Sequence, residues 1–227
     1  MKGVLFDFNG TRFFDSPLHC RAWKRIAMEY FHKQLTEEDL DKNVQGRPNN
    51  LILSYLSLST LSEEKRNEIA NEKEVRYRKL ASSDPAFLHF APGLTLFLEF
   101  LKKNHVPRAI ATSSEKSNRA WYRKVFPLLE YFPKEAIVYD DGSFQRGKPD
   151  PQIYEVAAKR IHLDPSSCVI FEDSASGLLS AYRAKAGKIV LVKDKNCPPT
   201  FLTPSYVDET IENYTPRKEN ILRFLGL

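Results

Sequence analysis

Two short apolar segments, each followed directly by carboxylates, constrain the fold more than any other feature. Residues 4–6 precede Asp7, and residues 168–171 precede Glu172 and Asp173. Unbroken apolar runs of this length are typical of strands buried on both faces of a parallel sheet. The acids would then lie at the carboxyl ends of their strands, where open α/β sheets bind ligands. Converging carboxylates at that edge favour a hard cation such as Mg²⁺.

Strand and helix patterns alternate along most of the chain. Further short apolar strands are expected at 108–112, 136–139 and 189–192. Helical segments are expected around 96–101 and at 117–126, 152–161, 175–185 and 219–227, and a loop at 196–199. This alternation predicts an α/β fold with a doubly wound parallel sheet and helices on both of its faces.

A run of helical segments without strands follows the first acid. Apolar residues recur at helical spacing from residue 18 to 30, and further helices are expected at 36–43, 48–58 and 62–80. We therefore predict an all-helical insertion at 17–86. Residues 1–16 and 87–227 would together form the α/β domain.

Composition excludes several classes of protein. Of 227 residues, 34 are basic and 29 acidic, a net charge of +5 that favours anionic substrates only weakly. No basic block with interleaved aromatic residues suggests nucleic acid, and no apolar run approaches the ~18 residues that span a membrane. The N-terminus has no signal-peptide pattern, so a cytoplasmic location is expected. Cys20, Cys168 and Cys197 predict neither a metal site nor disulfides.

Four short motifs occur in an order that resembles the haloacid dehalogenase superfamily. They are Asp7 with Gly10-Thr11, then Thr112-Ser113-Ser114, then Lys148-Pro149, and last Glu172-Asp173. The resemblance covers nearly all of the chain. It is closest to the phosphatases and β-phosphoglucomutases that carry a small helical cap inserted after the first motif.

The resemblance implies an aspartyl-phosphate mechanism with Mg²⁺. Asp7 would be the nucleophile that attacks phosphorus, because a carboxylate can divide one difficult displacement into two easier ones. The metal ligands would be Asp7, the backbone carbonyl of Asn9, Asp173 and, directly or through water, Glu172. A loop or helix cap is the alternative for a lone aspartate after a strand.

The remaining motifs would hold the phosphoryl group. Gly10, followed by Thr11, suits a tight turn that lets backbone N–H groups approach a phosphate. Thr112 and Ser113 match the motif that supplies a hydroxyl and an amide, although hydroxyls at a strand end are also typical of helix caps. Lys148 would offset negative charge on the phosphoryl group and on Asp7, whereas a lone lysine is usually solvated.

Asn9 departs from the family pattern. Most phosphatases and mutases of the superfamily carry a second aspartate there, as the general acid and base. Asn9 supplies the same backbone carbonyl, but an amide cannot pass protons at neutral pH. We expect substrate binding to survive and proton transfer to suffer. Asn9 is then either an engineered substitution that traps substrate or a natural residue that the enzyme tolerates because its leaving group is good.

Two residues of the helical insertion are candidates for substrate recognition. His19 falls where mutase-like members carry a histidine, and Arg47 follows Gly46 in a loop that would face the α/β domain. A histidine near a helix start is also a common packing or capping residue. Lys73 could reach the same cleft, but a solvated helix face is the simpler expectation for it.

These features favour a Mg²⁺-dependent phosphatase that acts on a small phosphorylated metabolite, with the cap excluding water. A sugar phosphomutase is the nearest alternative, although repeated transfer between hydroxyls needs the proton shuttling that Asn9 weakens. A nonenzymatic sensor of phosphorylated metabolites is the alternative from another class. The residues do not identify the substrate or the oligomeric state.

Overall fold

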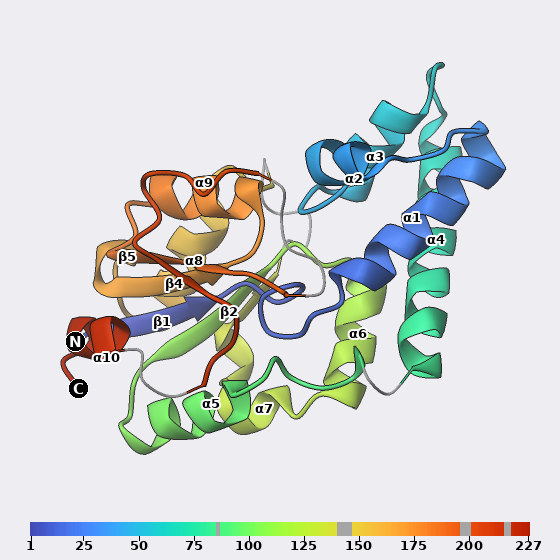
Figure 1. Cartoon of the computed structure of the whole chain (residues 1–227). Helices are drawn as coiled ribbons and strands as arrows, with labels where there is room; N and C mark the ends of the chain where they lie inside the picture. The colour runs from blue at the N-terminus through green and yellow to red at the C-terminus, as the bar shows by residue number, and fades with distance from the viewer. Residues whose placement is uncertain (85–86, 140–146, 196–200, 216–218) are drawn as a thin grey trace.

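Six parallel strands form one sheet at the centre of the computed structural model, which describes residues 1–84, 87–139, 147–195, 201–215 and 219–227. The strands are β1 (Gly3–Phe6), β2 (Arg108–Thr112), β3 (Ile137–Tyr139), β4 (Cys168–Glu172), β5 (Lys188–Val192) and β6 (Glu209–Ile211). Their order in the sheet is β3-β2-β1-β4-β5-β6. The chain runs outward from β1 in both directions, so β1 lies between β2 and β4 (Figure 1).

The register of the central strands brings the two acidic motifs together. Phe6 of β1 pairs with Ile110 of β2 and with Phe171 of β4. Asp7 and Glu172 each follow the paired phenylalanine of their own strand. Because the strands are parallel, these acids reach the same edge of the sheet, at its topological switch point.

Helices cover both faces of the sheet and give it two separate cores. The helices of the α/β part are α5 (Leu94–Lys103), α6 (Lys116–Val125), α7 (Leu128–Tyr131), α8 (Gln152–Arg160), α9 (Ala175–Arg183) and α10 (Glu219–Leu225). Helices α8 and α9 pack on one face with residues such as Leu5 and Ile170, while α5, α6, α7 and α10 pack on the other with Phe6 and Phe171. Successive side chains of a strand therefore point alternately into the two apolar cores on either face of the sheet.

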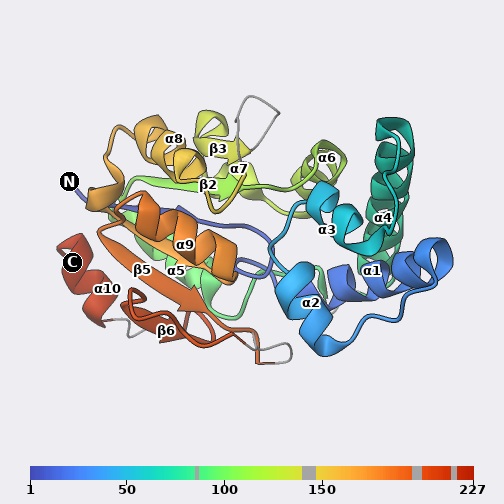
Figure 2. The ribbon, with the colours of Figure 1, turned by 90° about the horizontal axis from the view of Figure 1, so that it is seen from above.

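Four helices gather at one end of the molecule, beside the carboxyl edge of the sheet (Figures 1 and 2). They are α1 (Ser16–Phe31), α2 (Glu37–Asn43), α3 (Asn49–Leu56) and α4 (Glu63–Ser83). Trp23, Ile52 and Ile69 belong to a buried cluster that these helices share. Leu18 and Tyr77 instead join the core of the sheet, so α1 and α4 bridge the two parts.

The sequence prediction of an α/β fold with a parallel sheet is confirmed. The expected helices and strands are present, with ends that differ by a few residues; α3, for example, ends at Leu56 rather than at residue 58. The prediction missed β6, which has only three residues and includes polar Glu209 and Thr210, and it missed the single turn of α7.

Some predictions concern residues outside the described ranges. The loop at 196–199, with Cys197, is one of them, and the expected end of the helical insertion at residue 86 is another. The division into an α/β domain and a cap stays a prediction. Within the described ranges, none of the helices is long and apolar enough to cross a membrane.

Candidate active site

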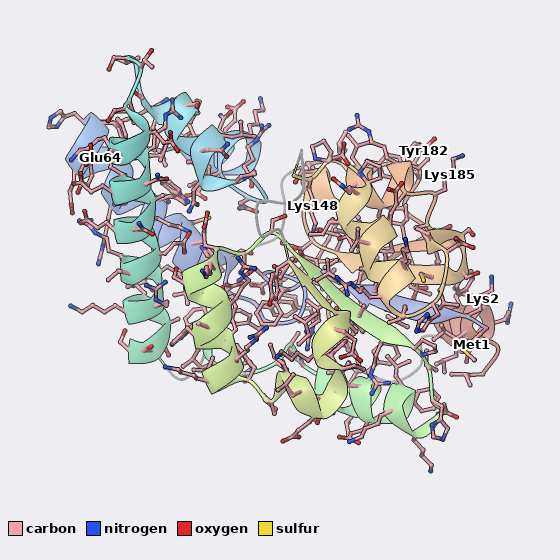
Figure 3. The ribbon with its side chains drawn as sticks, turned by 180° about the vertical axis from the view of Figure 1, so that it is seen from behind. Met1, Lys2, Glu64, Lys148, Tyr182 and Lys185 are labelled. Carbon is pink, nitrogen blue, oxygen red and sulfur yellow. The ribbon has the colours of Figure 1, made fainter. Side chains whose placement is uncertain are left out.

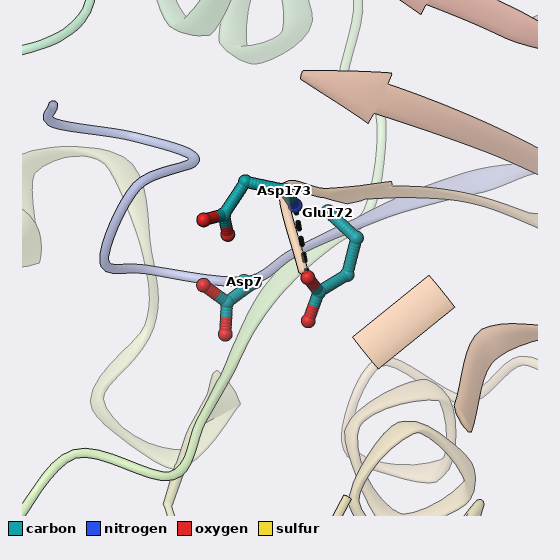
Figure 4. Close-up of side chains that lie close together, drawn as sticks. All are labelled: Asp7, Glu172 and Asp173. Carbon is teal, nitrogen blue, oxygen red and sulfur yellow. Dashed lines mark hydrogen bonds between the residues drawn. The ribbon is translucent and has the colours of Figure 1, made fainter. Parts of the chain in front are cut away.

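Three carboxylates converge at the carboxyl edge of the sheet (Figure 4). Asp7, Glu172 and Asp173 each offer one oxygen, and these oxygens lie within 4.8 Å of one another. Asp7 follows β1, and Asp173 follows β4. The sequence prediction that the two motifs meet is therefore confirmed as geometry, although their roles in catalysis stay predictions.

Glu172 is held rigidly on the inner side of this cluster. Its Oε2 accepts hydrogen bonds from the backbone N–H groups of Asp173 and Ser174, both at 2.9 Å. Its Oε1 accepts from Tyr154, 2.8 Å away, and the side chain is fully buried. A Cβ at Gly177 would collide with this carboxyl group, so that glycine makes room for it.

Lys148 is the cation of the cluster (labelled in Figure 3). Its Nζ lies 2.6 Å from Asp7 Oδ1 and 2.5 Å from Glu172 Oε1. The lysine side chain is buried, so the alternative of a solvated surface lysine is wrong. A buried ammonium between two carboxylates is strongly coupled to both, because little water screens the interaction.

The cluster contains more carboxylate charge than Lys148 offsets. Burial raises the pKa of Asp7 to about 7, against the opposing pull of Lys148 and with a further contribution from Glu172. Burial, Glu172 and Asp7 together raise the pKa of Asp173 well above its ordinary value. Lys148 outweighs burial at Glu172 and lowers its pKa. Asp7 and Asp173 therefore need a further positive charge in order to ionise together.

This donor set fits Mg²⁺. The three side chains offer only carboxylate oxygens, the ligands that a hard divalent cation prefers. The excess negative charge, visible in the raised pKa values of Asp7 and Asp173, is what a bound cation would neutralise. Gly10, with a φ of +69°, keeps space beside Asp173 that a Cβ would fill.

A pocket lies directly above the carboxylates, between the sheet and helices α1–α4. It encloses about 900 Å³, including space open to solvent. Its lining includes Asp7, Asp173 and Lys148, and also most of the other predicted site residues: Asn9, His19, Arg47, Thr112 and Ser113. Residues from both parts of the chain therefore meet around one cavity.

Gly10 and Thr11 occupy supporting positions. Among the described residues, the pocket lining includes neither of them. The Gly10 N–H donates to Asp15 Oδ1 at 2.9 Å, and the Thr11 hydroxyl donates to Asp173 Oδ1 at 3.0 Å. These contacts fix Asp15 and Asp173, and the phosphate contacts expected of Gly10 and Thr11 stay predictions.

His19 and Lys73 form one polar wall of the pocket. His19 Nδ1 lies 2.7 Å from Lys73 Nζ, and His19 Nε2 lies 3.1 Å from Asp15 Oδ2. Lys73 also pairs with Glu74 at 2.9 Å and is only 2% exposed. The expectation that Lys73 lies on a solvated helix face is therefore wrong, because α4 turns this side toward α1 and the pocket.

Arg47 lies at the rim of the same pocket and is exposed. Its Nε donates to the backbone carbonyl of Lys42 at 2.9 Å. The preceding Gly46 touches the α/β part, where Ser176 donates to its carbonyl at 2.9 Å. The loop that carries Arg47 is thus in contact with the start of α9, as the sequence led us to expect.

Several residues that organise the site were not identified from the sequence. Asp15 is fully buried and accepts hydrogen bonds from Asn9, Gly10 and Tyr77. Glu74 is buried and accepts from Asn49 of α3 and Asn118 of α6. Sequence reasoning also missed Tyr122 and Tyr154, and it identified Ser114 only as part of its motif, without its contact to Asn9. Long-range pairs of this kind leave no periodic pattern in a sequence.

Comparison with known proteins supports the family resemblance that the four motifs suggested. The family model for haloacid dehalogenase-like hydrolases matches residues 1–185. A phosphorylated carbohydrates phosphatase from Thermotoga maritima is 30% identical over 193 residues, which is 83% of this chain and 84% of that protein. Hexitol phosphatase A from Escherichia coli is 27% identical over 218 residues, or 96% of this chain and 95% of that protein.

Solved structures give a consistent result. The crystal structure of a family IA, variant 3 hydrolase from Entamoeba histolytica has a TM-score of 0.86, with 30% identity and 100% of both chains covered. β-Phosphoglucomutases are also among the matching sequences and structures. The resemblance inferred from the four motifs is confirmed. The chain is an enzyme that belongs to the haloacid dehalogenase-like hydrolase family.

Proposed function

We propose that this enzyme is a Mg²⁺-dependent phosphatase for small phosphorylated carbohydrates, acting through an aspartyl-phosphate on Asp7. The observation that carries the proposal is the contact of Asp7 with Lys148 at the base of a pocket that also contains Asp173. The printed functions of the two phosphatases described above support the substrate class.

The residues at the base of the pocket fit the first chemical step. Asp7 would attack phosphorus, and the bond from phosphorus to the leaving oxygen would break. Lys148 would hold the reacting carboxylate and offset charge on the phosphoryl oxygens. Asp7, Asp173, Glu172 and the carbonyl of Asn9 would hold Mg²⁺, which when bound neutralises charge on the phosphoryl group.

The polar residues around the pocket fit substrate recognition. Thr112 and Ser113 lie at the end of β2, beside Asp7 in the pocket lining, where hydroxyl and N–H groups would bind phosphoryl oxygens. His19 and Arg47 come from the proposed cap, residues 17–86, and would contact the rest of the substrate. A cap that closes on substrate would exclude water.

A phosphomutase is the second candidate, since β-phosphoglucomutases are among the related proteins. Mutases move a phosphoryl group between hydroxyls, and each transfer needs a proton to be moved. Asn9 cannot titrate, which favours hydrolysis over a mutase cycle. A sensor would bind phosphorylated sugars without turning them over.

Phosphate release from a panel of sugar and alditol phosphates tests the proposal. Activity should require Mg²⁺, disappear with a chelator, and be lost in Asp7→Asn. Lys148→Met should lower kcat by on the order of 10²–10³. Binding of the same ligands without release by any variant would indicate a sensor, and isomerised sugar phosphate without free phosphate would indicate a mutase.

A further inference from the structure

The side chain of Asn9 is fixed in one orientation by three neighbours. Its Nδ2 donates to Asp15 Oδ2 and to the Tyr122 hydroxyl, both at 2.6 Å. Its Oδ1 accepts a hydrogen bond from the Ser114 hydroxyl. Because an ionised carboxylate only accepts hydrogen bonds, Asp15 determines which end of the amide faces it.

Asp15 is itself fixed by further donors. It is 0% exposed and accepts from the Gly10 N–H at 2.9 Å and from the Tyr77 hydroxyl at 2.6 Å. His19 Nε2 lies 3.1 Å from the same carboxyl group. Asp15 directly precedes α1 as its N-cap residue, yet its side chain makes no capping hydrogen bond to that helix. The Asp15 carboxylate therefore accepts hydrogen bonds from Asn9 and its neighbours instead of capping the helix.

The carbonyl end of the Asn9 amide faces Ser114, which lies just after β2 in the pocket lining. Ser114, which donates to Asn9 Oδ1, lies 2.8 Å from Thr112 Oγ1. Asn9, Ser114, Thr112 and Asp7 all line the same pocket. An amide oxygen in this position can accept a hydrogen bond from a water molecule, but it cannot take the proton.

We propose that Asn9 Oδ1 orients the water that hydrolyses phosphorylated Asp7, with Asp15 and Tyr122 as the positioning residues that hold the amide. The water oxygen forms a bond to phosphorus, and the bond between phosphorus and Asp7 breaks and returns its electron pair to the carboxylate. Both protons of the water stay on the product, which leaves as dihydrogen phosphate. An amide that orients an attacking water serves the same purpose in GTPases.

This inference rests on the proposed function, but it makes a separate prediction about the second step alone. p-Nitrophenyl phosphate has a good leaving group, so its transfer to Asp7 needs no acid. Decay of the phosphorylated enzyme instead needs an oriented water. Loss of the amide carbonyl, or of a residue that holds it, should therefore slow decay of the phosphorylated enzyme more than its formation.

Rapid mixing with p-nitrophenyl phosphate and Mg²⁺, acid quench and intact-protein mass measurement give both rates. We expect Asn9→Ala to slow decay by roughly 10–100-fold, and Tyr122→Phe by about 2–10-fold, the worth of one hydrogen bond. Asn9→Gln, which keeps the amide, should recover part of the loss. Tyr182→Phe removes an exposed tyrosine hydroxyl on α9, outside the pocket lining, and should change neither rate.

The outcomes separate the two proposals. A phosphorylated intermediate whose decay is the same in wild type, Asn9→Ala and Tyr122→Phe overturns the role of Asn9 and leaves the proposed function intact. Equal slowing of formation and decay also overturns it, since the amide would then serve phosphoryl transfer in general. Turnover with no phosphorylated enzyme at any time would overturn the proposed aspartyl-phosphate mechanism itself.

Discussion

At the scale of single residues, the proposed function depends most on Asn9, which cannot supply a proton to a leaving group. An aspartate there would place a carboxyl oxygen where Nδ2 now lies, 2.6 Å from Asp15 Oδ2. Because like charges so close together disfavour ionisation, the new carboxyl group would tend to hold a proton that it could pass to a leaving group. Asn9→Asp therefore adds the acid that this chain lacks.

We predict that Asn9→Asp raises kcat on alkyl phosphates by on the order of 10²–10⁴, the usual contribution of a positioned acid or base. Aryl phosphates should gain little, because their leaving groups depart as stabilised anions. Steady-state phosphate release from matched alkyl and aryl esters measures the difference. The double variant with Asp7→Asn controls for contaminating phosphatase, and an unchanged alkyl rate would mean that another residue supplies the proton.

Arg12 gives a prediction about stability. Its side chain is fully buried, and within the described residues none of its three guanidinium nitrogens has a hydrogen-bond partner. Phenyl rings surround the guanidinium, namely those of Phe6, Phe8, Phe90 and Phe132. Burial lowers the pKa of Arg12 to about 9, so the group stays charged at neutral pH.

We expect Arg12→Met to raise the free energy of unfolding by about 1–4 kcal/mol, as when other buried charges are replaced by apolar side chains. Desolvation of an unpaired cation costs more than the surrounding rings return. Urea denaturation with a two-state fit measures the change. A loss of stability would show that the cation–π contacts outweigh desolvation.

The sequence predicted individual site residues where a motif carried the information. Asp7, Lys148 and Glu172 meet as expected because two strand ends and one loop set their positions. Lys73 could not be placed correctly, since the charged pattern of α4 does not reveal that the helix packs against both α1 and α6. Asp15 resembled an ordinary residue before a helix, and only the fold shows its contact with Asn9.

At the scale of elements, the loop between α2 and α3 makes a packing contact with the start of α9 in the α/β part. Gly46 in this loop has a φ of +67°, and a Cβ there would collide with Ser174. The same loop carries Arg47 into the pocket rim. Its conformation and its close approach to α9 both require glycine.

We predict that Gly46→Ala lowers kcat/KM for sugar phosphates at least tenfold by displacing the loop from α9. The left-handed backbone adds a stability cost of about 1–2 kcal/mol. Gly226→Ala is the matched control: its φ is +78°, but nothing lies within 4 Å of the added methyl. Gly226→Ala should therefore lose stability and keep its activity. Normal kcat/KM in Gly46→Ala would mean that the loop contact is dispensable.

A buried ion pair on helix α4 is joined to α6 by a hydrogen bond from an amide side chain. Glu74 accepts from Asn118 of α6 at 2.7 Å and pairs with Lys73 at 2.9 Å. Burial opposes ionisation of Glu74, but Lys73, His19 and a hydrogen bond from Asn49 outweigh it and lower the pKa to about 2. The folded value lies below the ordinary 4.5, so ionised Glu74 stabilises the fold above about pH 4.5.

We expect Glu74→Gln to reduce the unfolding free energy at pH 7 by about 3–5 kcal/mol, because Lys73 is left buried and unpaired. The difference from wild type should shrink as pH falls from 4.5 toward 2, where the carboxylate becomes protonated. Urea titrations at several pH values measure it. Adding Lys73→Met should restore part of the loss, and a pH-independent difference would contradict the assigned ionisation.

At the scale of the whole molecule, the site exists only because distant segments meet. Asp7, Thr112, Lys148 and Asp173 come from different strand ends and loops, while His19 and Arg47 come from the helices at the edge of the sheet. The alternation of strands and helices was sufficient to predict the sheet and its functional edge. The shape of the pocket depends on how α1–α4 pack on that edge, which a single sequence does not specify.

The central claim is that Asp7 carries the phosphoryl group, and locating that group tests it most directly. The enzyme would be mixed with p-nitrophenyl phosphate and Mg²⁺, quenched in acid, digested, and analysed by mass spectrometry. The account predicts one phosphoryl group on the peptide that contains Asp7, and none in Asp7→Asn. A phosphoryl group on another residue, or wild-type turnover by Asp7→Asn, would contradict it.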